Sequence, residues 1–98
     1  MSLSPPQKSF LRSQAHHLKP VVQLGQRGLT ESVVAEIGNA LDAHELIKVR
    51  IGGDDRESRA AAIDEIVRET GADLVQSIGH IAVFFRRNEK KPRIALPA

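Results

Sequence analysis

Residues 24–30, Leu-Gly-Gln-Arg-Gly-Leu-Thr, join a short apolar run, Val21–Leu24, to a segment with helical periodicity. The two glycines, Gly25 and Gly28, permit backbone conformations and close approaches that a Cβ atom would block. Thr30 is a favourable N-cap, and the start of a helix presents unpaired N–H groups that favour anions. The order strand, glycine loop, helix therefore predicts an α/β domain whose loop can contact phosphates.

The loop also carries polar side chains. Gln26 and Arg27 lie between the glycines, and Lys19 precedes the strand. A Gly-x-x-Gly pattern alone is weak, because at an average glycine usage of about 7% it occurs by chance on the order of 0.5 times in a hundred residues. Its position between a strand and a capped helix makes the prediction stronger. We expect Gly25, Gln26, Arg27, Gly28 and Lys19 to form an anion-binding site.

The rest of the chain alternates between helical and strand patterns. Ser4-Pro5-Pro6-Gln7 is typical of a capped helix start, and Gly71 of a helix end. The expected elements are a helix at 5–15, a strand at 21–24, a helix at 31–43, a strand at 46–51, a helix at 56–70, and strands at 74–78 and 81–86 joined by a Gly79-His80 turn. This order, α-β-α-β-α-β-β, predicts one small two-layer α/β domain over residues 1–98, with a mixed four-stranded sheet, one poorly covered sheet face and a basic tail at about 87–98.

Two elements besides the loop are expected to carry basic side chains. Alternation along residues 46–51 places Lys48 and Arg50 on one face of a strand. Lys8 and Arg12 lie four residues apart on the first helix and form a basic pair near its polar side. We include these four residues in the predicted binding site.

Charge is segregated along the chain, although the net charge is only +2. Residues 1–28 contain Lys and Arg but no acid, whereas residues 29–47 contain acids but no Lys or Arg. A base-only segment that leads into a glycine loop favours a polyanionic partner such as nucleic acid.

Neither export nor membrane insertion is indicated. Cysteine is absent, which excludes disulfides, thiolate zinc sites and cysteine nucleophiles and agrees with a reducing compartment. The N-terminus lacks a signal-peptide pattern, and no apolar run approaches a membrane span of about 20 residues. We expect a cytoplasmic monomer.

Catalytic, metal and cofactor sites are not indicated either. His44-Glu45 is followed by Lys48 where a zinc-protease helix would need a second histidine. The adjacent His16-His17 would point about 100° apart on a helix, which favours structural or polar-contact roles over a shared metal. Asp54-Asp55 is better explained by helix capping. No nucleophile with a base is recognisable, so we predict no enzymatic activity and no cofactor.

Aromatic residues are few, namely Phe10, Phe84 and Phe85, with no Tyr or Trp. This argues against RNA readers that need an aromatic sheet surface. Phe10 and Phe85 are expected in the core. Phe84 points to the opposite face of its strand, where we expect the tail to cover it in preference to an open stacking platform. The tail is expected as an extended basic arm, although Ile94 and Leu96 could dock.

Three blocks together resemble a known family: Ala-His-His-Leu-Lys-Pro at 15–20, Gly-Gln-Arg-Gly-Leu-Thr at 25–30, and Ala-Leu-Asp-Ala-His-Glu-Leu-Ile-Lys-Val at 40–49. They are similar, over nearly the whole chain, to the CRM (chloroplast RNA splicing and ribosome maturation) domain, and the length resembles its bacterial stand-alone YhbY-type members. The resemblance implies an RNA-binding domain with a fold similar to the C-terminal domain of translation initiation factor three. It maps the family's glycine loop onto residues 25–28 and marks Lys19, Lys48 and Arg50.

The resemblance also implies a partner, because the stand-alone members are associated with precursors of the large ribosomal subunit. We therefore expect a noncatalytic protein that binds ribosomal RNA during assembly. The alternative is a protein-interaction adaptor that uses its acidic second and third helices to bind a basic ribosomal protein or assembly factor.

Overall fold

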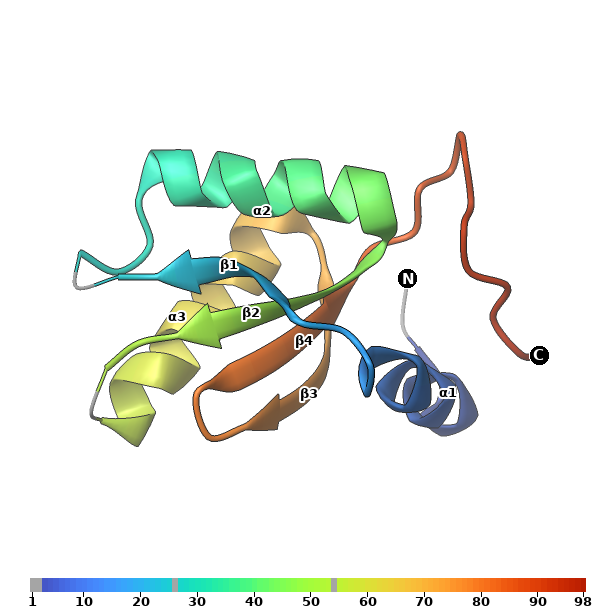
Figure 1. Ribbon diagram of the computed structural model, residues 1–98, viewed down its shortest axis with the longest axis horizontal. Coiled ribbons are helices and arrows are strands. Elements are labelled where there is room, and N and C mark those ends of the chain that lie inside the picture. The colour runs from blue at the N-terminus through green and yellow to red at the C-terminus, as the bar shows by residue number, and fades with distance from the viewer. Residues whose placement is uncertain (1–2, 26, 54) are drawn as a thin grey trace.

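The computed structural model describes residues 3–25, 27–53 and 55–98. Its elements are α1 (Pro5–Ala15), β1 (Pro20–Leu24), α2 (Glu31–His44), β2 (Leu46–Ile51), α3 (Arg56–Thr70), β3 (Asp73–Ile78) and β4 (Ile81–Phe85) (Figure 1). The predicted α/β class and element order are confirmed. The bounds differ from the predicted ones by at most one residue, as is usual where helices and strands fray.

The helix ends follow local signals in the sequence. Ser4, Thr30 and Asp55 are the N-caps of α1, α2 and α3, and each side chain accepts a hydrogen bond from a backbone N–H in the first turn. Gly71, with φ +73°, ends α3 in the left-handed conformation that favours glycine. Asp54, also expected as a capping residue, lies outside the described residues.

The four strands form one mixed sheet in the order β1-β2-β4-β3. β1 pairs with β2 in parallel, whereas β4 is antiparallel to both β2 and β3. The loops that follow the parallel strands β1 and β2 therefore lie at the same edge of the sheet. Figure 1 shows these loops, and the turn between β3 and β4, at the end of the sheet away from α1.

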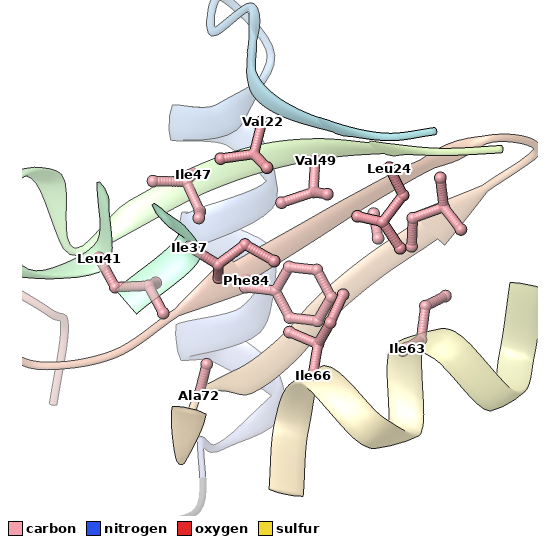
Figure 2. Packing of buried hydrophobic residues seen from close by; sticks show 12 residues of the cluster. Val22, Leu24, Ile37, Leu41, Ile47, Val49, Ile63, Ile66, Ala72 and Phe84 are labelled. Carbon is pink, nitrogen blue, oxygen red and sulfur yellow. The ribbon is translucent and has the colours of Figure 1, made fainter. Parts of the chain in front are cut away.

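The main core lies between one sheet face and helices α2 and α3 (Figure 2). Phe84 is fully buried there, in one cluster with Ile37 of α2 and Ile66 of α3. The expectation that the tail covers Phe84 is therefore wrong. Phe84 lies opposite Ile47 in the β2–β4 ladder, on the sheet face that the two helices cover. A ring without exposed surface cannot stack on a base.

A second, smaller core lies on the opposite sheet face. Leu11 and Ala15 of α1 are buried in one cluster with Phe85, and Ile94 and Leu96 of the tail pack against it. The sheet face that was expected to be poorly covered is thus partly covered, and the tail docks instead of extending as a free arm. The burial of apolar side chains from both α1 and the tail drives their docking on the sheet.

Candidate nucleic-acid interface

The glycine loop begins at the end of β1 and leads into α2. Gly28 has φ +69°, and its N–H donates to Gly25 O at 3.0 Å. A Cβ atom on either glycine would meet nothing within 4 Å. Gly28 is therefore required by its backbone conformation, and the open space around both glycines leaves the loop accessible.

Arg27 is exposed in this loop. With Gly25, Gly28 and Thr30 it lines an open depression of about 550 Å³ beside the first turn of α2. No acidic residue is among the described residues that line it. The cation and the positive end of the helix dipole both favour an anion at this position. Gln26, also predicted in the site, lies outside the described residues.

The end of the sheet next to the glycine loop is closely packed. A Cβ atom on Gly52, just after β2, would lie 3.0 Å from Leu24 O, so the two loops approach each other where only glycine fits well. The N–H of Ile51 donates to His80 O at 2.7 Å, and His80 Nδ1 lies 2.9 Å from Ile51 O. His80 is thus a turn residue, as predicted, and its ring also ties the β3–β4 turn to β2.

The basic residues predicted on α1 and β2 face the side of the sheet away from α2 and α3. Lys48 is half-buried and Arg50 is exposed, and their partners on β4 are Val83 and Ile81. Lys48 and Arg12 line one cavity of about 580 Å³, here termed the sheet groove. Its wall is the end of α1, with Arg12, His16 and His17, and its floor includes Lys48, Ile78 and Ile81.

A smaller pocket of about 360 Å³ adjoins the sheet groove through Lys48, which lines both. Lys19 lines this pocket together with Val21 and Ile94. No acidic side chain lines either cavity among the described residues. Lys8 is half-buried on α1, one turn before Arg12, and lies outside both sets of lining residues.

The predicted residues therefore fall into two groups. The glycine loop with Arg27 follows β1 at one end of the sheet, whereas α1, which carries Arg12, lies at the other end (Figure 1). Lys19 directly precedes β1, on the α1 side. Arg50 and Lys48 on β2 lie between the two groups, with Arg50 nearer the glycine loop. Arg12, Lys48 and Arg50 therefore share one sheet face, and Arg27 lies in the loop beyond the end of the sheet toward which β2 runs.

A buried carboxylate that the sequence patterns did not single out fixes the tail. Glu45, the C-cap of α2, is fully buried and accepts hydrogen bonds from the N–H groups of Asn88 (2.7 Å), Arg93 (2.6 Å) and Ile94 (2.8 Å). Burial raises the pKa of Glu45, but these three hydrogen bonds and the charge of Arg87 outweigh burial, so that its pKa is lowered. Its partners are 43 to 49 residues away, and no local signal could have indicated the contact.

Within the described ranges, no three His, Asp or Glu side chains are grouped so as to hold a metal ion. In the same part of the chain, every helix is too short or too polar to cross a membrane.

Comparison with known proteins identifies the family. Residues 3–86 match the CRS1/YhbY (CRM) domain. An RNA-binding protein of Haemophilus influenzae is 57% identical over 96 residues, which are 98% of this chain and 96% of the relative. The probable RNA-binding protein YqeI of Bacillus subtilis is 37% identical over 93% of this chain and 95% of its own length.

The fold agrees with that match. The solution structure of a hypothetical protein from Staphylococcus aureus superposes with a TM-score of 0.84 at 32% identity, over 98% of this chain and 100% of the other. Sequence and fold therefore agree over nearly the full length, and the chain belongs to the CRS1/YhbY (CRM) domain family.

Proposed function

We propose that this chain is a noncatalytic RNA-binding protein, and that its target is ribosomal RNA of the large subunit or its precursor during assembly. The observation that carries the proposal is the exposed glycine loop with Arg27, which Arg50 and Lys48 connect to the sheet groove. Relatives that match over nearly the whole chain are named RNA-binding proteins. The resemblance to stand-alone CRM proteins supports the ribosomal target.

Phosphate is the group that this surface suits best. The loop offers backbone N–H groups, a guanidinium and room for close approach, and β2 adds two cations on one face. Contacts of this kind position a nucleic acid by its backbone and do not by themselves select a sequence. Recognition by charge and RNA shape is therefore expected to dominate.

The buried carboxylate of Glu45 does not offer a catalytic base. A buried acid with a shifted pKa is a candidate general base. Both oxygens of Glu45, however, already accept backbone hydrogen bonds, and the side chain is fully buried. Glu45 is accordingly assigned to holding the tail.

Charge reversal in the loop tests the proposal. Arg27→Glu should weaken binding to a large-subunit ribosomal RNA transcript at least tenfold in a filter or anisotropy titration, because it replaces a phosphate contact with repulsion. The matched control is Arg68→Glu, which makes the same charge change on α3. Arg68 is exposed, and its ion pair with Glu65 is long, at 3.9 Å. The control should stay within twofold of the parent, and both variants should keep their stability within about 0.5 kcal/mol. Equal affinity of the parent and Arg27→Glu for the transcript would show that the loop does not belong to the binding surface.

The ribosomal target is tested separately. On a sucrose gradient of lysate with intact RNA at low salt, the protein should co-sediment with large-subunit precursors more than with translating ribosomes. Sedimentation with free soluble protein alone would contradict the assembly role without contradicting RNA binding.

An adaptor function is the second candidate, because α2 and α3 together form an acidic depression beside the glycine loop. Glu31 of α2 and Glu65 and Glu69 of α3 line one depression, with no basic residue among the described ones. Capture of a basic ribosomal protein that survives ribonuclease treatment and is lost on Glu65→Lys would favour this function.

A further inference from the structure

The sheet groove holds two side chains that the proposed phosphate contacts do not use, His16 and His17. Both are exposed and line the groove wall. The backbone around them is fixed, because His16 N–H donates to Ser13 O at 3.3 Å and Leu18 N–H donates to Ala15 O at 2.9 Å. The two rings lie edge to face, with centroids 5.2 Å apart and an interplanar angle of 80°. Among the described residues, none forms a hydrogen bond with either ring, so both can meet a ligand.

The groove combines positive charge with an apolar floor. Ile78 on the edge strand β3 is 65% exposed, and its partner on β4, Ile81, is half-buried. Arg12 and Lys48 supply the charge. Exposed apolar surface inside a basic cavity suits a ligand that has both an apolar face and an anionic group.

An unpaired nucleotide has this combination, because its base has a flat face and its phosphate a negative charge. Histidine is one of the side chains on which unpaired RNA bases stack, whereas paired RNA keeps its base faces inside the helix. The groove volume of about 580 Å³ is within the roughly 300–1,000 Å³ of small-ligand sites. We infer that the sheet groove binds an unpaired segment of RNA, with a base against His16 or His17 and its phosphates beside Arg12 and Lys48.

Two further observations favour this occupant. Phe84 and Phe85 are 0% and 1% exposed, so the sheet phenylalanines cannot provide a stacking surface. Lys48 and Arg50 are two residues apart on β2, a separation of about 6.7 Å, and lead from the groove toward the glycine loop. A strand that leaves the groove would therefore follow cations toward Arg27.

The inference rests on the proposed RNA binding and specifies which part of the RNA enters the groove.

The test compares the binding of fluorescein-labelled oligoadenylate as a single strand with the binding of the same strand annealed to oligouridylate. His16→Ala/His17→Ala should weaken single-strand binding at least about fivefold, the loss expected for one stacked base, and leave duplex binding unchanged. His16→Phe/His17→Phe should restore it, because stacking needs a ring and no charge. Asn39→Ala removes an exposed polar side chain of α2 that lines neither the groove nor the adjoining pocket, and is the matched control.

A spectroscopic signal identifies stacking directly. The fluorescence of 2-aminopurine within the oligoadenylate should change on binding to the parent and the Phe variant, because the base exchanges adenine neighbours for a side-chain ring, and should not change on binding to the Ala variant. Equal single-strand affinity of the Ala variant and the parent, or failure of the Phe variant to restore binding, would overturn the inference while RNA binding through the loop stands. A parent that binds the large-subunit transcript but not single-stranded oligoadenylate would also overturn the inference, whereas a parent that binds none of these RNAs would overturn the proposed function itself.

Discussion

Glu45 occupies a backbone conformation that usually belongs to glycine. Its φ of +64° ends α2, and among non-glycine residues in the described ranges it alone has a positive φ. Its carboxylate compensates for this conformation, because it satisfies three backbone N–H groups of the tail in a buried environment. The residue thus stops a helix and docks a distant segment at the same time.

Glu45→Gln should lower the free energy of unfolding by roughly 2–3 kcal/mol at neutral pH, because an amide cannot accept all three hydrogen bonds and carries no charge. Urea denaturation measures the loss. Glu89→Gln makes the same chemical change on an exposed tail residue and should have little effect.

The difference between Glu45→Gln and the parent should depend on pH. Because the folded-state pKa of Glu45 is lowered from 4.5, its contribution is fully present above about pH 4.5 and is lost as pH falls through the folded-state pKa. The two proteins should therefore converge in stability in acid. A difference that stays constant down to that range would show that the charge of Glu45 does not stabilise the tail.

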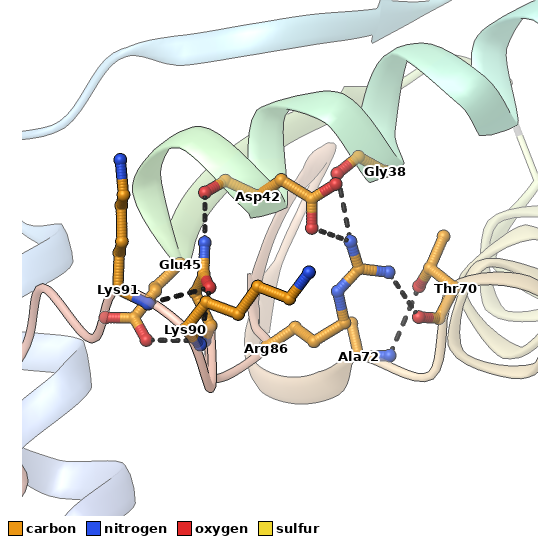
Figure 3. Close-up of polar contacts among 9 residues, drawn as sticks. Gly38, Asp42, Glu45, Thr70, Ala72, Arg86, Lys90 and Lys91 are labelled. Atoms are coloured by element: carbon orange, nitrogen blue, oxygen red, sulfur yellow. Dashed lines mark hydrogen bonds and ion pairs between the residues drawn. The ribbon is translucent and has the colours of Figure 1, made fainter.

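At the scale of elements, Arg86 joins the two helices that cover the sheet (Figure 3). Its Nη2 donates to Asp42 Oδ1 at 2.8 Å and to Gly38 O at 3.0 Å on α2, and its Nη1 donates to Thr70 O at 2.6 Å at the end of α3. A cation at the carboxyl end of α3 also interacts favourably with the helix dipole. This basic residue is structural, although its charge alone resembles that of the predicted binding residues.

Arg86→Leu should destabilise the fold by about 1.5–3 kcal/mol, because it removes charged hydrogen bonds to α2 and α3. RNA affinity of the folded variant should stay within twofold, since Arg86 contacts the helix layer and lies outside the lining of the sheet groove. Arg68→Leu, on an exposed arginine of α3, should cost less than about 0.5 kcal/mol. A stable Arg86→Leu variant with weakened RNA binding would reassign Arg86 to the interface.

For the whole molecule, basic and acidic side chains line different surface depressions. Cations line the cavities on the α1 side, whereas acids line the depression between α2 and α3. Such separation orients a polyanion toward one face even when the net charge is only +2. The base-only segment 1–28 therefore contributes cations to the cavities beside α1, whereas the acids of α2 and α3 gather in a separate depression.

RNA affinity should fall at least tenfold between low and physiological salt, because each neutralised phosphate releases counterions. For single-stranded RNA, the slope of log affinity against log salt should be about −0.7 per contact, and Arg27→Glu should reduce its magnitude by about that amount. A fluorescence titration over a salt series measures both. A flat response would contradict the electrostatic account and favour the adaptor function.

The predictions that the structure confirms depend on interactions between residues close together in the sequence. Caps at Ser4, Thr30 and Asp55, the left-handed end at Gly71 and the alternation of β2 each depend on a few neighbouring residues, and the structure confirms them. The prediction for Phe84 was wrong because the side chains on both faces of β4 are apolar. Alternation along the strand assigns residues to one face or the other, but it does not show which face packs against α2 and α3.

Local patterns along the chain were enough to predict the order of helices and strands, the glycine loop before α2, the basic residues of α1 and β2, and the family. The folded structure was needed to show that the tail docks on Glu45, that Phe84 belongs to the helix-covered core, and that His16 and Arg12 share a groove with Lys48. Capping and alternation act between neighbours in the chain, whereas these contacts join distant residues that only the packing of helices and tail on the sheet brings together.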